Sequence, residues 1–475
     1  MKLYRESNFN RIIVITIITL VCSTSCKKFV EVGPPVTQLV TTSVFNNNST
    51  ANAAQTAIYS QMEGKESLPY LMALYTGLSS DELKNYSTSS DLGQFYSNSL
   101  ISTNSELVNL WSPIYNYIYQ ANAIIEGLSK STGVSPQVKQ QLIGESKFIR
   151  AFWHFYLVNL FGDVPLVTST NYKINSLATR SPKELVYAQI IADLIDAQKL
   201  LNTNYVGADG ITTTDEKVRP NRWVATALLA RVYLFTHDYA NAEIQATSLI
   251  NNLDFSLNTD LNDVFLANST EAIWQLMIPL PNNTLNTVEG RDFILNSIPQ
   301  DNIYNCTTIS DQLINSFEPG DSRFANWISA FPSGSTLYYF PYKYKVYSSS
   351  TVTEYSMVFR LAEQFLIRAE ARVNLEENNA VNDLNVIRNR SGLSNYSGSL
   401  DRASLLAAIY HEREVEFFTE WGHRWIDLKR SGGIDAVMIT AASLKGGHWN
   451  SSSQLYPLPQ AEITKDPNLK QNQGY

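Results

Sequence analysis

Residues 150–166 read RAFWHFYLVNLFGDVPL and close a long apolar segment. The segment opens at Ser135-Pro136, a pair typical of a helix start because proline fits the first helical position. Apolar side chains then recur at three- and four-residue steps, at Leu142, Ile143, Phe148, Ala151, Phe155 and Val158. Glycine and then proline follow in Gly162-Asp163-Val164-Pro165, which is the signal of a helix end. The spacing therefore predicts one helix over residues 136–161.

Similar periodicity predicts further helices on both sides of this segment. They span 49–63, 105–127, 181–202, 220–235, 239–250, 355–375, 379–390 and 404–420. Two neighbouring pairs, 220–250 and 355–390, are predicted to form helical hairpins. Alanines let the axes of such helices approach closely, so each pair resembles a tetratricopeptide unit. No strict 34-residue period is present, and the chain is predicted to be mainly α.

Residues 65–104 and 253–350 break the helical pattern. They are irregular, and the second stretch is rich in Asn, Pro, Gly and Ser, with short strand-like pieces at 271–277 and 337–347. Loops carried by a rigid scaffold are the usual place for binding residues. We therefore expect these two stretches to hold the ligand site and to add minor β structure to the helical fold.

Polar and aromatic residues in these stretches are the candidate ligand-binding residues. An aromatic ring stacks on the C–H face of a sugar, and an amide bonds its hydroxyl groups. The candidates are Asn85, Tyr86, Phe95, Tyr96, Trp327, Tyr338 and Tyr339. Local packing of a long loop is the alternative for each of these rings.

The first 26 residues indicate export. Lys2, Arg5 and Arg11 precede the apolar run Ile12–Cys22, which is too short to cross a bilayer and has the length found in signal peptides. Ser23-Thr24-Ser25-Cys26 follows and resembles a bacterial lipobox. We predict a signal peptide over 1–25, lipidation of Cys26 and a tether over 26–48. An ordinary secretory signal is the alternative.

Composition and motifs exclude several classes of protein. The 475 residues carry a formal charge of −8 and no basic tract, which argues against nucleic-acid binding. His411-Glu412 lacks the second histidine of a zinc motif, and no phosphate-binding or serine-hydrolase motif is present. We predict no cofactor and no metal ligands, and leave a structural Ca²⁺ open.

Glu412, Glu416 and Glu420 lie at four-residue steps on one predicted helix. Two carboxylates on one face can hydrolyse glycosides. Because Arg413 and Arg424 are interleaved with them, a charge-paired helix junction is favoured over a catalytic pair. Cys306 would be the last cysteine after lipidation and is interpreted as a structural thiol.

Ordered motifs over most of the chain resemble the SusD/RagB family of outer-membrane nutrient-uptake lipoproteins. They are the lipidated start at Cys26–Pro35, Arg150–Leu157, Phe161–Leu166, Ala227–Leu234, Arg360–Glu363, Leu384–Arg388, Trp421–Arg430, Tyr456–Pro459 and Asn468–Tyr475. The resemblance implies a SusD-like fold with about four tetratricopeptide-like hairpins. It implies one domain over 49–475, with an N-terminal part at 49–250, an irregular insertion at 253–350 and a C-terminal part at 351–475.

The resemblance also implies a function. Members of the family are lipid-anchored at the cell surface, are not enzymes, and act as lids on a TonB-dependent SusC-like β-barrel transporter. They capture oligosaccharides, or peptides in some branches, and hand them to the barrel. A tetratricopeptide-like scaffold that binds only proteins is the alternative. The family's ligand residues are not part of its shared motifs, so the candidates named above rest on their position alone.

Overall fold

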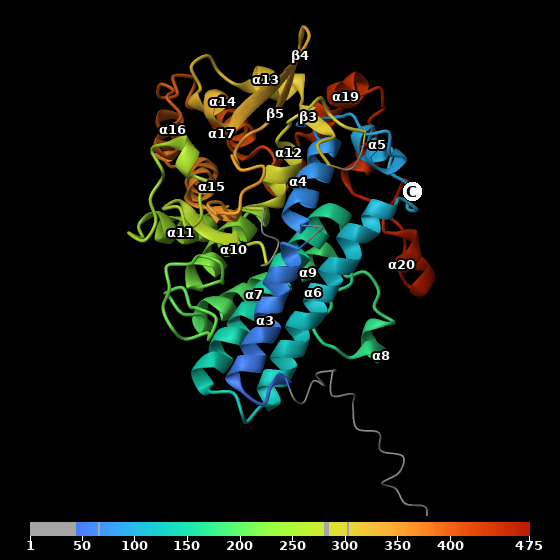
Figure 1. The fold of residues 1–475 in the computed structure, drawn as a ribbon, viewed down its shortest axis with the longest axis vertical. Helices are drawn as coiled ribbons and strands as arrows, with labels where there is room; N and C mark the ends of the chain where they lie inside the picture. The colour runs from blue at the N-terminus through green and yellow to red at the C-terminus, as the bar shows by residue number, and fades with distance from the viewer. Residues whose placement is uncertain (1–43, 65–66, 280–284, 302–303) are drawn as a thin grey trace, which may run out of the picture. The chain divides into compact units, whose positions relative to one another are not determined.

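The computed structural model describes residues 44–475, apart from 65–66, 280–284 and 302–303. This part of the chain is mostly helical, as Figure 1 shows. The helices longer than one turn are α3 (Asn48–Met62), α4 (Leu68–Ser79), α5 (Ser90–Tyr96), α6 (Ser105–Lys130), α7 (Pro136–Phe161), α9 (Lys183–Leu200), α10 (Arg222–Phe235), α11 (Tyr239–Ile250), α12 (Val288–Phe293), α13 (Asp311–Ser316), α14 (Ser322–Trp327), α15 (Leu361–Asn374), α16 (Ala380–Arg390), α17 (Arg402–Phe417), α18 (His423–Arg430), α19 (Ile434–Leu444) and α20 (Gln460–Lys465). Short turns are α8 (Tyr172–Asn175), η2 (Leu261–Asp263) and η3 (Ser451–Gln454). None of these helices is long and apolar enough to cross a membrane.

Helix α7 is the centre of the helical scaffold, and its bounds are those predicted from the sequence. It packs against α6 on one side and α9 on the other, while α3 lies along both α6 and α7 (Figure 1). Phe152 and Trp153 are fully buried within it. Arg150 is also buried, and its guanidinium meets the Asp193 carboxylate of α9 at 2.6 Å. Apolar packing and this buried ion pair with α9 fix the helix in place.

Both predicted helical hairpins form. Asn221 accepts hydrogen bonds from the amides of residues 223 and 224 and so caps α10. Ala242 and Ala246 of α11 pack against Ala230 of α10 in one buried cluster. That cluster also contains Ile367 and Ala371 of α15, so α11 joins the first hairpin to the second, α15–α16. The small side chains allow the close helix approach that the sequence predicted.

Two predictions about elements are wrong. Residues 68–79, expected to be irregular, form α4, in which nearly every side chain is buried. A helix that is apolar all round shows no periodic stripe, so the pattern search cannot find it. Residues 356–360, expected to be helical, form the strand β6, and the helix α15 begins only at Leu361. All five residues of β6 are buried, and a continuous apolar run does not separate strand from helix.

Three antiparallel pairs make up the β structure of the described residues. Strand β1 (Leu83–Asn85) pairs with β3 (Thr307–Ile309), with Leu83 opposite Ile309. Strand β2 (Ala272–Leu276) pairs with β6 (Ser356–Arg360), and β4 (Ile328–Ser333) forms a hairpin with β5 (Thr336–Pro341). In Figure 1 β3, β4, β5 and α5 lie at the same end of the molecule. The strands expected at 271–277 and 337–347 are therefore confirmed, the second in shorter form.

Candidate ligand-binding site

Strands β1 and β5 bring two tyrosines together from distant parts of the chain. Tyr86 directly follows β1, and its amide donates to the Cys306 carbonyl at 2.8 Å, which extends the pairing of β1 with β3. Tyr338 stands in β5 opposite Phe331 of β4. The ring centroids of Tyr86 and Tyr338 are 5.8 Å apart, and the rings cross at 71°. Tyr86 is 39% exposed, so this edge-to-face pair presents aromatic surface to solvent.

Tyr96, the last residue of α5, is partly exposed beside this pair. Burial raises the pKa of Tyr96, and the neighbouring Tyr86 and Asp311 raise it further. Asp311 itself is exposed and forms a 2.7 Å ion pair with Lys84 of β1. We refer to Tyr86, Tyr96 and Tyr338 together as the tyrosine face.

Lys445 supports the ring of Tyr96, and the sequence analysis did not identify it. Its Nζ lies 5.1 Å from the Tyr96 ring centroid and donates to the carbonyl of Leu78 at 2.7 Å and to that of Ser80. These carbonyls are at the C-terminal end of α4, where a helix favours positive charge. Burial lowers the pKa of Lys445 to about 7, although Asp81 and Glu82 oppose this. Lys445 is thus a positioning residue for the tyrosine face, and no periodicity or motif points to it.

Asn85 shapes the loop next to the tyrosine face. Its side-chain oxygen accepts from the Ser87 amide at 3.0 Å, and its Nδ2 donates to the Ser87 carbonyl at 3.2 Å. Such a local turn uses much of the amide's hydrogen-bonding capacity. The loop is also held by Thr88, whose amide and hydroxyl donate to the Asp301 carboxylate at 2.6 and 2.8 Å. The structure therefore places Asn85 beside the rings, with its amide engaged in holding the loop.

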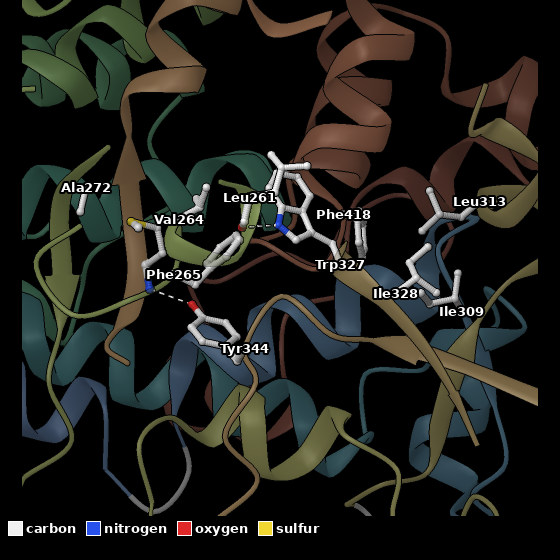
Figure 2. Packing of buried hydrophobic residues seen from close by; sticks show 11 residues of the cluster. Leu261, Val264, Phe265, Ala272, Ile309, Leu313, Trp327, Ile328, Tyr344 and Phe418 are labelled. Carbon is white, nitrogen blue, oxygen red and sulfur yellow. Dashed lines mark hydrogen bonds between the residues drawn. The ribbon is translucent and has the colours of Figure 1, made fainter. Parts of the chain in front are cut away.

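Two of the seven predicted ligand residues are wrong, because their rings are completely buried. Trp327 has no exposed surface, and its Nε1 donates to the Leu261 carbonyl at 2.9 Å in the core that Figure 2 shows. Phe95 is also fully buried, stacked on Tyr75 at 4.7 Å and in edge contact with Tyr456 at 5.3 Å. Both are core residues, as the alternative of local packing allowed.

Tyr339 points away from the tyrosine face. Successive side chains of a strand project to opposite faces, so Tyr338 and Tyr339 of β5 are separated. Tyr339 packs on the same core as Trp327 and contacts Phe324 at 6.0 Å. Cys26, the predicted lipidation site, lies outside the described residues.

The carboxylates on α17 form a buried ionic network. Glu416 has no exposed surface and pairs with Arg323 at 2.9 Å, with Arg360 at 2.5 Å and with Arg390. Glu420 pairs with Arg360 at 2.8 Å and lies beyond the end of α17 at Phe417. The favoured interpretation, a charge-paired helix junction, is confirmed. No group of three or more His, Cys, Asp or Glu side chains in the described residues is arranged to hold a metal ion.

Two family descriptions match this chain. Residues 28–234 match the family described as "Starch-binding associating with outer membrane", and residues 328–475 match the SusD family. The chain belongs to the SusD/RagB family. The two matches leave out residues 235–327, most of the predicted insertion.

Individual relatives agree with this assignment over nearly the full length. SusD-like protein P25 of Formosa agariphila is 24% identical, over 95% of this chain and 97% of its own. Among solved structures, a SusD superfamily protein from Bacteroides vulgatus is similar with a TM-score of 0.77 and 21% identity, covering 91% of this chain and all of its own. A structure described as a laminarin-binding SusD-like protein gives a TM-score of 0.75 at 22% identity with the same coverage. The SusD-like fold expected from the sequence is therefore confirmed.

Proposed function

We propose that this protein is a non-catalytic, surface-exposed outer-membrane lipoprotein that captures oligosaccharides and delivers them to a TonB-dependent SusC-like transporter. The observation that carries the proposal is the ring pair of Tyr86, which is exposed, and Tyr338, which is half-buried. The protein belongs to a family whose description is "Starch-binding associating with outer membrane". One similar solved structure is described as a laminarin-binding SusD-like protein.

The chemistry of the tyrosine face suits a sugar. Rings at 71° to each other offer one flat surface and one edge, and a pyranose can stack its C–H face on the first while its hydroxyls meet the phenol groups. The rings belong to the residue after β1, to strand β5 and to the last residue of α5, all attached to the helical core, so little conformational freedom is lost on binding. A neutral oligosaccharide is the ligand class that this surface favours.

A binding panel with the variants Tyr86→Ala and Tyr338→Ala tests the capture step. The panel contains soluble neutral glucans and short peptides, measured by calorimetry on the full chain in detergent. An aromatic contact contributes about 0.5–1.5 kcal/mol, so each variant should weaken glycan binding up to about tenfold. Tyr172→Ala is the matched control, because Tyr172 is 73% exposed on α8 and belongs to no part of the tyrosine face.

Three outcomes can be distinguished. Weaker binding in both tyrosine variants, with the Tyr172 variant unchanged, supports the proposed site. Glycan affinity that survives loss of both rings would move the site elsewhere. Binding of peptides in place of glycans, lost in the same variants, would keep the site and change the ligand class.

A further inference from the structure

A large cleft lies in the helical part of the molecule, apart from the tyrosine face. It is a cleft of about 1110 Å³ between the C-terminal end of α7, the outer side of α9, the turn joining α10 to α11, helix α18 and the C-terminal segment 470–473. It shares no lining residue with the tyrosine face. Its volume exceeds that of many small-molecule sites, which hold about 300–1000 Å³.

The lining of this cleft is basic, although the chain as a whole carries −8. Its acidic side chains are only Asp163 and Glu184, both exposed. Its basic side chains are Arg180, Lys183, Lys429, Arg430 and Lys470. A cleft lined by one sign of charge concentrates ligands of the opposite sign. The surplus of positive charge therefore points to an anionic ligand.

Most of these cations have no carboxylate partner. Arg430 is neutralised by Asp427 and Glu370, at 2.7 and 2.6 Å. The other four basic side chains form no ion pair within the part of the chain that the structure describes. Arg180 instead donates to the carbonyls of Asp163, at 2.6 Å, and Phe161, at 3.1 Å. These hydrogen bonds hold its guanidinium in place, and the nearby Asp163 carboxylate interacts with its charge without forming an ion pair.

Lys429 is a cation of the cleft lining with no ion pair among the described residues. It is partly buried in α18, and its Nζ donates to the Asn159 carbonyl in the last turn of α7. An ammonium group has three protons to donate, and one neutral carbonyl with the Trp425 ring 5.8 Å away does not offset its charge. Burial lowers the pKa of Lys429 to about 7. Capping of α7 accounts for one donor, and an anionic group in the cleft would satisfy the remainder.

The neutral part of the lining indicates what else the ligand carries. The side chains of Gln454 and Gln473 reach no hydrogen-bond partner among the described residues, and both line the cleft. Tyr187 and Phe235 add aromatic surface. Free amides suit hydroxyl groups, and rings suit the C–H face of a sugar. We propose that this cleft is a second ligand site that takes an acidic oligosaccharide, with its carboxylate or sulfate groups on Lys183, Lys429 and Lys470.

The test compares charged and neutral ligands of equal length on the full chain at fixed ionic strength. The probes are tetragalacturonate, which carries carboxylates, neutral cellotetraose, a tetra-aspartate peptide and inorganic sulfate. The double variant Lys183→Gln/Lys470→Gln removes two exposed cations from the rim, neither of which has a side-chain partner in the described residues. Tetragalacturonate should bind at least tenfold more tightly than cellotetraose in the cleft, and this variant should reduce that affinity at least fivefold.

A control variant outside the cleft and a further variant inside it complete the experiment. Lys130→Gln/Lys173→Gln removes the same charge from exposed lysines outside the cleft and should leave tetragalacturonate binding unchanged. Lys429→Gln should weaken binding more than the rim variant. If Lys429→Gln fails to fold because α7 loses its cap, the rim variant still decides the question.

Several results would overturn the proposal. One is an equal loss of tetragalacturonate affinity in Lys183→Gln/Lys470→Gln and in Lys130→Gln/Lys173→Gln. Such a result would mean that only the overall charge of the protein attracts the ligand. Another is equal or tighter binding of tetra-aspartate, which indicates an acidic peptide site. Binding of sulfate alone would show a single-ion site. Loss of tetragalacturonate binding in Tyr86→Ala/Tyr338→Ala would place the acidic sugar on the tyrosine face, whereas loss of neutral glucans alone in that variant tests the proposed function separately.

Discussion

Glu416 is held among three arginines in the interior, and its ionisation depends on them. Burial alone would raise the pKa of Glu416, but Arg390, Arg360 and Arg323 outweigh it and keep the pKa well below its usual range. A buried ion pair adds little when compared with an apolar core of the same shape. Removal of one partner is costly, because it leaves the other charges buried and uncompensated.

Glu416→Gln is therefore expected to destabilise the protein strongly. The neutral amide leaves Arg360 and Arg390 with less compensation, and breaking such a pair costs about 3–5 kcal/mol. Urea unfolding followed by tryptophan fluorescence measures the change. Asp196→Asn is the matched control, since Asp196 is half exposed in its pair with Lys147, and its loss should cost less than about 1 kcal/mol. Equal stability of the Glu416 variant and the wild type would show that the network does not hold the junction.

The sign of the pH effect follows from the lowered pKa. A carboxylate whose pKa is lower in the folded state stabilises the fold above its unfolded value, near 4.5, and this contribution is lost as the pH falls. The wild type should therefore lose part of its advantage over Glu416→Gln below about pH 4.5. Urea unfolding of the wild type and of Glu416→Gln at a series of pH values measures this decrease in the difference between their free energies of unfolding.

Helix α7 ends at Gly162 because only glycine fits there. Gly162 has a φ of 75° and a ψ of −132°, a backbone conformation that a side chain makes costly. Its amide still donates to the Val158 carbonyl at 3.1 Å. A Cβ at this position would lie 2.9 Å from Leu455 Cδ1, a contact tighter than side chains tolerate. The turn sends the chain back toward α9.

Gly162→Ala is expected to lower the free energy of unfolding by about 1–3 kcal/mol, the usual cost of backbone strain. Gly93→Ala is the matched control. Gly93 lies inside α5, with no atom within 4 Å of the position of an added Cβ. Alanine there should stabilise by about 0.5–1 kcal/mol, because it restricts the unfolded chain and favours helix. Thermal unfolding of the two variants compares them directly, and a neutral Gly162 variant would contradict the argument from φ.

Local signals decide which elements the sequence could predict. Pro136 and Gly162 mark both ends of α7, and α11 is likewise predicted to the residue. Helix α4 is missed, because burial on all sides removes its periodicity. In the candidate site, Tyr86 is exposed and Tyr338 is half-buried, whereas Trp327 lies in the core. Tertiary packing sets which face of a strand or helix a ring occupies. Lys445 and Tyr96 are in contact although they are 349 residues apart in the sequence, so no local pattern could predict this contact.

The whole molecule separates a stiff scaffold from the surfaces it carries. Contacts pass in chain order from α6 through α7, α9, α10 and α11 to α15 and α16, so each helix is fixed by its neighbours. The tyrosine face stands on short strands and loops attached to this scaffold, and the basic cleft lies within the scaffold itself. Two surfaces with different chemistry would let one rigid body hold neutral and acidic ligands at the same time.

Import by the proposed route requires that Cys26 attach this body beside a transporter. Lipid attachment with several acyl chains is effectively permanent, so the anchored chain would stay with its β-barrel partner through many cycles. We expect the tagged full chain, purified from native outer membranes, to bring one β-barrel protein with it in equal amount by mass spectrometry. Cys26→Ser should abolish labelling by palmitate and reduce recovery of the partner at least tenfold. Cys22→Ser is the matched control, four residues earlier in the predicted signal peptide, and should keep both. Purification of the wild-type chain alone, or with soluble proteins only, would favour a scaffold that binds proteins over an importer lid, because a lid cannot deliver its ligand without the barrel.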